Sequence, residues 1–258
     1  GFGQDGPYVH RAGYDYIVQG LGGIMDLTGD PHGEPQKIGV AFADIFTGLY
    51  GVIAIQAALA QRERTGRGQH IDMALLDCMT GVLANQALNY LVSGVSPHRM
   101  GNAHPNIAPY QVFAVADGHV ILAVGNDGQF ARLCQALGQP GLAAEPDFAT
   151  NAARVGSRDR LTGLLAPLIA AYGRDDFLAM MEATGVPAGP INSVSDVFAD
   201  PQVIARGMRI AMAEDAALGG TVPGVRTPIR FSDADLALSR PSPRLGQHTQ
   251  EILAEIGL

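Results

Sequence analysis

The chain has 258 residues, 47% of them hydrophobic, which is enough to bury roughly 70% or more of the unfolded surface in one or two cores. This composition excludes an intrinsically disordered chain. Its 17 Lys and Arg residues against 25 Asp and Glu residues give a formal net charge of -8. Such an acidic balance offers no basic field for a phosphate backbone, so we expect no nucleic-acid partner.

In chain order, residues 13–29 predict a short helix followed by a glycine-rich turn. Residues 40–60 form the longest apolar stretch, but they include Asp44 and Gln56 and run directly into the charged QRER. This pattern favours a buried helix of a soluble protein over a membrane span. A turn, a short strand over residues 71–73 and a helix ending at Gly94 are expected next.

Residues 110–125 predict a β-hairpin, because two β-rich runs flank Asp117-Gly118, a pair typical of type I′ turns. A helix is then expected after Ser157, with one apolar stripe. The stripe comprises Leu161, Leu164, Leu165, Leu168, Ile169 and Tyr172. A further helix is expected from about Asp175 to Gly185. Helix and strand thus mix along the chain, which indicates two subdomains with a junction near residue 101.

The two cysteines, Cys78 and Cys134, lie in apolar surroundings without a CxxC motif, which favours a reducing cytoplasm. The first residues, GFGQDGPY, do not resemble a signal peptide, and the initial Gly suggests a processed or incomplete chain. The seven histidines show no HxxxH or HExxH spacing, so we expect no metal site.

Asp44 is the first candidate catalytic residue, since it opens a long apolar helix, where a carboxylate interacts favourably with the helix dipole. A carboxylate in contact with substrate can act as a nucleophile. The alternative is that Asp44 only stabilises the start of its helix.

Tyr14 and Asp15 form the second candidate, thirty positions earlier. A tyrosine hydroxyl can donate a hydrogen bond to an oxyanion, and an aspartate can position or exchange protons. The alternative is a core tyrosine with a satisfied hydroxyl.

Residues 101–106, GNAHPN, form the third candidate, here called the GNAHPN loop. Gly101 allows the backbone to approach a ligand closely, and Asn102, His104 and Asn106 offer polar groups. The alternative is a turn-rich connection with solvated side chains.

Together these segments resemble the class III CoA-transferases, the CaiB/BaiF family, which includes formyl-CoA transferase and the α-methylacyl-CoA racemases. The resemblance is carried by blocks in family order: GFGQDGPY, GYDYIVQGLGGIMDLTG, IGVAFADIFTGLYG, RTGRGQHIDMALLD, GNAHPNIAPYQVF, GNDGQF, FATNAARV, GVPAGPIN, FADPQV and PRLGQHTQEIL. It implies an α/β fold with a partial Rossmann-like large domain, a smaller α+β domain, and two subunits interlocked as a homodimer.

On this resemblance, residues 1–100 are a large-domain portion with the catalytic aspartate, residues 101–210 the small domain, and residues 211–258 a segment that returns to the large domain. The family's usual N-terminal segment, which supplies much of its CoA-binding surface, does not precede GFGQDGPY. A separate chain that supplies this segment is one alternative.

The resemblance also implies that Asp44 is the family's catalytic aspartate and that Tyr14 and Asp15 are active-site positions. The racemase branch has histidine where this chain has Tyr14, so the transferase branch is favoured. The GNAHPN loop resembles the family's glycine-rich loop in position, although only Gly101 remains as glycine, so its location is carried over but not its detailed chemistry. Gly101, Asn102, His104 and Asn106 are therefore the candidate residues for binding substrate or CoA.

The expected function is therefore transfer of CoA from an acyl-CoA thioester, such as succinyl-CoA, to a carboxylic acid through an aspartyl anhydride and thioester on Asp44. CoA enters as a substrate, no cofactor is permanently bound, and no membrane partner is expected. Two alternatives stay open: an acyl-CoA racemase or isomerase of the same fold, and a non-catalytic chain that binds acyl-CoA or a partner.

Overall fold

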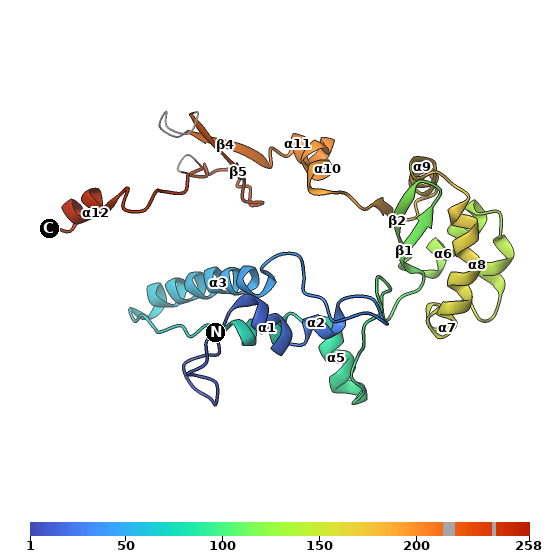
Figure 1. Ribbon diagram of the computed structural model, residues 1–258, viewed down its shortest axis with the longest axis horizontal. Helices are drawn as coiled ribbons and strands as arrows, with labels where there is room; N and C mark the ends of the chain where they lie inside the picture. Colours follow the sequence, from blue (N-terminus) through green and yellow to red (C-terminus); the bar gives the residue numbers. More distant parts are fainter. Residues whose placement is uncertain (214–219, 239–240) are drawn as a thin grey trace. The chain divides into compact units, whose positions relative to one another are not determined.

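The computed structural model describes residues 1–213, 220–238 and 241–258 (Figure 1). Residues 214–219 and 239–240, which belong to the expected C-terminal segment 211–258, lie outside the described residues. The chain forms two compact units, Gly1–Pro190 and Ile191–Leu258. The three-part division expected from the sequence stays a prediction.

The first part of unit one is helical. Its helices are α1 (Asp15–Leu21), α2 (Ile24–Leu27), α3 (Phe42–Thr65), α4 (Leu75–Gly81) and α5 (Ala84–Ser93). Val18, Ala43 and Met79 are fully buried where α1, α3 and α4 meet. This small core fixes the first turn of α3 against α1, and so it brings the region of Asp44 next to the region of Tyr14 and Asp15.

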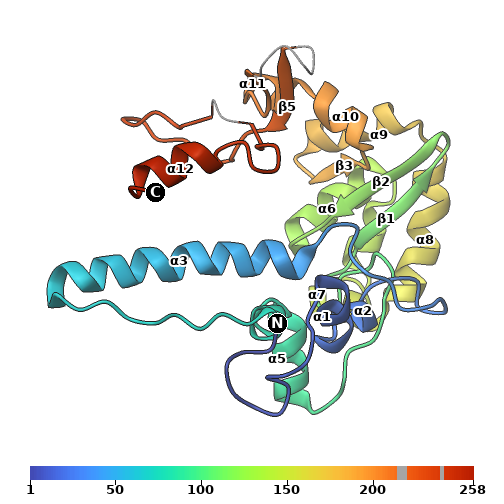
Figure 2. The ribbon, with the colours of Figure 1, turned by 60° about the vertical axis from the view of Figure 1, so that its left-hand side comes forward.

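Most of α3 is exposed, contrary to the buried helix expected from the sequence. Figure 2 shows the helix along its length and the extended connection that returns from its end to α4. Only Ala43 is buried on the helix, whereas Leu49, Val52 and Ile53 are 55%, 59% and 63% exposed. By length and composition α3 is the one helix of the described residues that could cross a membrane. An apolar sequence indicates that a helix tends to be buried, but it does not identify the surface that buries it. For this reason the prediction of a buried helix was wrong.

The larger core of unit one lies behind a three-stranded antiparallel sheet in the order β1-β2-β3. The strands are β1 (Tyr110–Val115), β2 (Gly118–Ala123) and β3 (Ala188–Pro190). The surrounding helices are α6 (Asp127–Ala136), the 3-10 helix η1 (Pro140–Ala144), α7 (Asn151–Gly156), α8 (Arg158–Ala170) and α9 (Arg174–Thr184). Leu161, Leu165 and Ile169 of the expected α8 stripe are buried, while Leu164 is 38% exposed.

The predicted hairpin is confirmed, but its turn differs from the expected Asp117-Gly118 type. Val115 pairs with Gly118, so Ala116 and Asp117 form the turn. Among the described non-glycine residues only Ala84 has a positive φ, so Asp117 does not adopt a type I′ conformation. Instead, Asp117 Oδ1 accepts a hydrogen bond from the backbone nitrogen of Arg174 at 2.7 Å. Together with the hydrogen bond from the backbone nitrogen of Ala116 to the carbonyl oxygen of Tyr172 at 2.9 Å, this contact ties the turn to the segment that begins α9.

Unit two contains a two-stranded antiparallel sheet of β4 (Arg209–Ala213) and β5 (Thr221–Val225). Its helices are α10 (Val194–Ala199), α11 (Pro201–Ala205) and α12 (Thr249–Glu255). Ser193 and Asp196 form a capping box at the start of α10.

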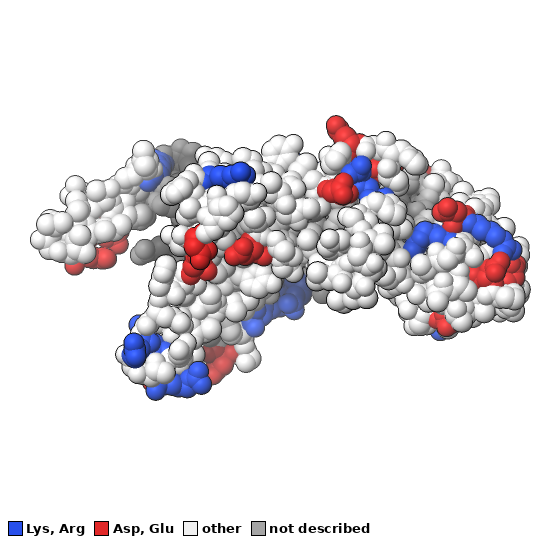
Figure 3. Space-filling model, turned by 90° about the horizontal axis from the view of Figure 1, so that it is seen from below, with Lys and Arg blue, Asp and Glu red and all other residues white. Residues whose placement is uncertain are grey.

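Acidic and basic side chains are interspersed with a larger uncharged surface on the face drawn in Figure 3. The mixture of helices and strands expected from the sequence is confirmed.

Candidate active site

The first turn of α3 receives its cap from a residue far away in the sequence. Ala41, at the N-cap position, offers no side-chain acceptor. Asp15 Oδ1 takes this role: it accepts hydrogen bonds from the backbone nitrogens of Ala43 at 2.8 Å and Asp44 at 3.4 Å. A carboxylate in this place satisfies amides that the helix leaves without intrahelical partners. The structure therefore joins Asp15 to the backbone of Asp44.

Gln19, which is fully buried, holds the carboxylate of Asp15 from the other side. Gln19 Nε2 donates to Asp15 Oδ2 at 2.8 Å and to the carbonyl oxygen of Val40 at 3.3 Å. Gln19 Oε1 accepts from the backbone nitrogen of Ile38 at 2.9 Å. Both ends of this buried amide are thus hydrogen-bonded, and losing one partner would cost about 1–3 kcal/mol. Gln19 fixes both Asp15 and the segment that leads into α3.

Asp44 and Tyr14 expose their side chains beside this network. Asp44 lies in the first turn of α3, as expected, and is exposed. Tyr14 occupies the N-cap position of α1 and is 72% exposed, which excludes the alternative of a core tyrosine. Both exposed residues are linked to Asp15: Asp44 through its backbone nitrogen, which donates to Asp15 Oδ1, and Tyr14 as its neighbour in the chain.

The GNAHPN loop has a defined conformation. Gly101 has φ +60°, a left-handed value that favours glycine, and its nitrogen donates to the carbonyl oxygen of Gly29 at 3.1 Å. Asn102 is exposed. Asn106 Oδ1 accepts from the side-chain nitrogens of Asn85 and Asn89 on α5 at 3.3 and 3.4 Å. The loop is therefore tied to the helical part of unit one.

His104 of this loop presents a particular tautomer when it is neutral. Its Nδ1 accepts a hydrogen bond from the backbone nitrogen of Asn106 at 3.1 Å, so the neutral ring carries its proton on Nε2. Burial, and secondly the positive charge of Arg158, lower the pKa of His104 from its usual value. The ring packs against Tyr110, with 5.2 Å between centroids. His104 can therefore offer an N–H donor to a ligand at neutral pH.

The structure joins Asp15 to the backbone of Asp44, with Tyr14 next to Asp15 in the chain, but in the described part of the chain no hydrogen bond joins these residues to the GNAHPN loop. Three further residues, which the sequence did not identify as site residues, contact this region: the side chains of Asn151, Arg154 and Arg158 donate hydrogen bonds to the backbone of residues 105–108. Their sequence block, FATNAARVGSR, contributes to the family resemblance and contains helix-start residues at Thr150 and Ser157, but none of these signals assigns a contact to the three side chains. Buried arginine is too uncommon for composition to predict it.

The described residues contain no group of three or more His, Cys, Asp or Glu side chains that could hold a metal ion. Cys78 and Cys134 are both free and buried. Burial raises the pKa of the Cys134 thiol to about 11, against a smaller opposing effect of Arg154. Of the residues singled out in the sequence, Asp44 and Tyr14 are exposed and His104 is partly buried.

Comparison with known proteins places this arrangement in a family. The chain is 56% identical over 257 residues to a succinate–glutarate CoA-transferase of Agrobacterium fabrum, covering 99% of this chain and 64% of that protein. It is 40% identical over 256 residues to the human succinyl-CoA:glutarate CoA-transferase, covering 99% of this chain and 58% of that protein. The chain thus spans somewhat less than two thirds of the length of these relatives.

A crystal structure of a CaiB/BaiF family protein from Brucella suis superposes on this fold with a TM-score of 0.82 at 64% identity. The alignment covers 99% of this chain and 66% of that one. The expected family fold is thereby confirmed. The model of CoA-transferase family III matches residues 1–249, nearly the full chain. The chain belongs to CoA-transferase family III.

Proposed function

We propose that the protein carrying this chain transfers CoA from succinyl-CoA, or a similar dicarboxylic acyl-CoA, to a second dicarboxylate such as glutarate. The observation that carries this proposal is the exposed carboxylate of Asp44 in the first turn of a capped helix, within a chain that matches a succinate–glutarate CoA-transferase over 99% of its length. CoA is a substrate in this reaction, and no permanently bound cofactor takes part.

In the proposed mechanism, a carboxylate oxygen of Asp44 attacks the thioester carbonyl carbon of the donor. The C–S bond breaks, CoA leaves as the thiolate, and a mixed anhydride remains on Asp44. The thiolate then attacks the aspartyl carbonyl carbon, which releases the donor acid as a carboxylate and leaves an aspartyl-CoA thioester. The acceptor carboxylate then attacks the aspartyl-CoA thioester, which gives a second mixed anhydride and CoA thiolate. The thiolate attacks the acceptor's carbonyl carbon, so that acyl-CoA product and free Asp44 result without water or redox chemistry.

The oxyanion of each tetrahedral intermediate needs a hydrogen-bond donor. The backbone nitrogens of Ala43 and Asp44 already donate to Asp15, and that of Ile45 donates to the carbonyl oxygen of Ala41 at 3.0 Å. Because the amides of this turn are occupied, we assign the oxyanion role to the exposed hydroxyl of Tyr14. Asp15 acts as a positioning residue, since its hydrogen bonds hold the backbone of Asp44.

The GNAHPN loop is assigned to binding the acyl-CoA, with Gly101 allowing close approach and Asn102, His104 and Asn106 as polar contacts. His104 suits this role because its neutral ring can donate from Nε2 to a thioester or carboxylate oxygen. The active protein is proposed to be an interlocked homodimer in the cytoplasm. The exposed apolar side chains of α3 support the assignment of a dimer, and the two free thiols support the assignment to the cytoplasm.

The test is to trap the acyl-enzyme. The full-length natural protein is incubated with succinyl-CoA, treated with hydroxylamine or borohydride, digested and analysed by mass spectrometry. We expect a hydroxamate or a reduced side chain at Asp44, and the exposed Asp5 serves as an internal control for nonspecific modification. An unmodified Asp44 with several acyl-CoA donors would refute covalent transfer. Deuterium exchange at the α-carbon without any acceptor acid would then support the isomerase.

A further inference from the structure

Four successive backbone carbonyl groups, those of residues 105–108, accept hydrogen bonds from side chains of α7 and α8. The donors are Asn151, Arg154 and Arg158, which we call the loop clamp. The bonds run from Arg158 Nη2 to Pro105 O at 3.2 Å, Asn151 Nδ2 to Asn106 O at 2.9 Å, Arg158 Nη1 to Ile107 O at 3.2 Å, and Arg154 Nε to Ala108 O at 2.7 Å. Asn151 Oδ1 also accepts from the backbone nitrogen of Ala108 at 3.2 Å.

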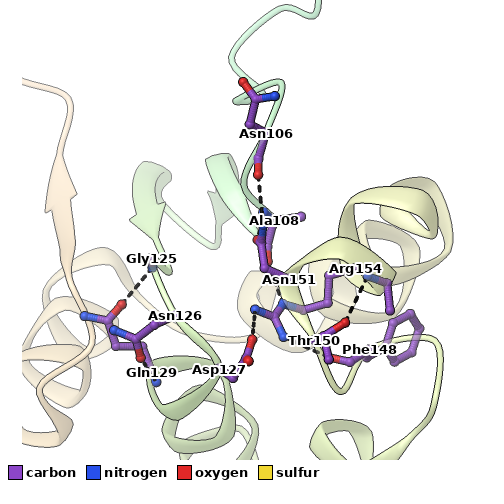
Figure 4. A network of polar contacts seen from close by, with 11 residues as sticks. Asn106, Ala108, Gly125, Asn126, Asp127, Gln129, Phe148, Thr150, Asn151 and Arg154 are labelled. Atoms are coloured by element: carbon purple, nitrogen blue, oxygen red, sulfur yellow. Dashed lines mark hydrogen bonds and ion pairs between the residues drawn. The ribbon is translucent and has the colours of Figure 1, made fainter. Parts of the chain in front are cut away.

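Arg154 is the rigid centre of this clamp (Figure 4). It is fully buried, and its Nη2 lies 2.8 Å from Oδ1 of Asp127 on α6, while Nη1 donates to the carbonyl oxygen of Phe148 at 2.9 Å. Its guanidinium also lies 4.5 Å from the ring centroid of Phe130. Since every nitrogen of the side chain has a partner, the group cannot rotate away from Ala108 without losing several contacts.

The loop is therefore held from two directions. The side chain of Asn106 is bonded to Asn85 and Asn89 of α5, and its carbonyl oxygen is bonded to Asn151 of α7. Arg158 affects the loop in two ways. Its positive charge contributes to the lowered pKa of His104, and its guanidinium donates a hydrogen bond to the backbone that follows His104. The carbonyl groups of an exposed loop can be hydrogen-bonded by water alone. Here, protein side chains donate to each of the four carbonyl groups of residues 105–108.

We propose that Asn151, Arg154 and Arg158 are positioning residues, which hold the GNAHPN loop in the conformation needed for CoA transfer. This proposal rests on the proposed function, since it takes the loop to contact the acyl-CoA. None of the three residues needs to touch the substrate. A displaced loop lowers the fraction of bound substrate in reactive geometry, and a shift of about 1 Å in a positioned group can reduce a rate by about 100-fold.

The test compares Asn151→Ala with Arg160→Ala in the full-length natural protein. Asn151→Ala removes one hydrogen bond to the loop, at Asn106, and one to Ala108 just after it, while Thr150 still caps α7. Arg160 lies on α8 two residues beyond Arg158, but its side chain pairs with Glu145 and Asp147 and not with the loop. Arg160→Ala is therefore the control for removing a polar side chain from the same surface.

For Asn151→Ala we expect kcat to fall by about 10-fold or more, with a smaller change in KM for succinyl-CoA, because no group that binds CoA is removed. Amide hydrogen exchange over residues 101–108 should accelerate in the same variant. Arg160→Ala should leave both readouts near the wild-type values. Asn151→Asp, which keeps the acceptor for Ala108 but loses the donor to Asn106, should give an intermediate loss and serves if Asn151→Ala fails to fold.

Faster exchange with kcat unchanged relative to Arg160→Ala would refute the proposal, because the clamp would then be structural only. A lower kcat without faster exchange at residues 101–108 would also refute it, since the effect would not act through the loop. Wild-type protein without transferase activity would instead refute the proposed function, and the catalytic role of the clamp with it.

Discussion

The carboxylate of Asp15 caps the helix that carries Asp44, with Oδ1 at 2.8 Å from the backbone nitrogen of Ala43. The two acidic residues thereby have different tasks, although both lie at the same helix end. Asp15 is hydrogen-bonded on both oxygens, by Ala43 and by Gln19, whereas Asp44 exposes its side chain. One carboxylate is engaged in hydrogen bonds that hold the start of α3, and the other is exposed.

Asp15→Ala should destabilise the protein by about 1 kcal/mol, because the first turn of α3 loses its side-chain cap. Asp15→Asn should cost less, since an amide oxygen can still accept from Ala43. Urea denaturation of both variants, followed by circular dichroism, measures the difference. Equal stabilities for the wild type and Asp15→Ala would contradict the capping role.

Asp44→Ala should abolish CoA transfer while leaving stability within about 0.5 kcal/mol of the wild type, because an exposed side chain is removed. The rate of glutaryl-CoA formation from succinyl-CoA and glutarate is the measurement, with Asp5→Ala as the control at another exposed aspartate. Full turnover by folded Asp44→Ala would eliminate Asp44 as the nucleophile.

Cys134 should be unreactive in the folded protein. Its side chain is fully buried and its pKa is about 11, so roughly one thiol in a thousand is ionised at pH 8. In a Cys78→Ser variant of these 258 residues, in which Cys134 is the one remaining cysteine, Ellman's reagent should react slowly at pH 8 and rapidly after addition of guanidinium chloride. Equal rates in both conditions would show that the thiol is accessible.

The raised pKa of Cys134 also predicts a pH dependence of stability. Between its ordinary value of 9.0 and about 11, the unfolded state loses the thiol proton while the folded state keeps it. Because the unfolded state then binds fewer protons, the free energy of unfolding should fall as pH rises through this window. Denaturation of Cys134→Ala should show a weaker fall.

His104 should stay neutral at a lower pH than an ordinary histidine. The positive charge of Arg158 is the second cause of its lowered pKa, after burial, so Arg158→Gln should raise this pKa and Arg158→Lys should raise it less. Titration of the ring signals by NMR measures both. A lowered pKa means that the unfolded state binds the proton more readily, so stability should fall as pH decreases below about 6.5. An unchanged pKa in Arg158→Gln would rule out the coupling.

Leu165→Ala should destabilise the protein by about 2–5 kcal/mol, because it leaves a cavity in the core behind the sheet. Its neighbour Leu164 on the same helix is 38% exposed, whereas Leu165 is fully buried. Leu164→Ala should therefore cost much less and is the matched control. Similar losses in the two variants would contradict the orientation of α8.

Local patterns in the sequence were sufficient for several elements. Leu161, Leu165 and Ile169 of the predicted stripe form the buried face of α8, although Leu164 of the same stripe is exposed. Gly185 marked the end of α9, where it has φ +65° at the C-cap. The first turn of α3 was also predicted with Asp44 in place. These features depend on residues within a few positions of each other, so periodicity and capping residues identify them.

Features that depend on distant partners were missed. The cap from Asp15 to Ala43 spans 28 positions, and nothing in the local sequence marks it. The strand expected over residues 71–73 does not form, since those residues have no partner strand in the described part of the chain. Arg154 was missed for a related reason: its burial depends on Asp127 and on backbone carbonyl groups that lie up to 46 positions away.

The loop clamp also determines when the GNAHPN loop acquires its conformation. Its donors follow their acceptors in the chain by 45 to 53 positions. During synthesis the loop therefore emerges well before α7 and α8, and these contacts form only once the helices dock on the sheet. The candidate binding loop thus reaches its conformation only when the core around Leu165 folds. A defect in that core is therefore expected to remove the hydrogen bonds that hold the loop as well.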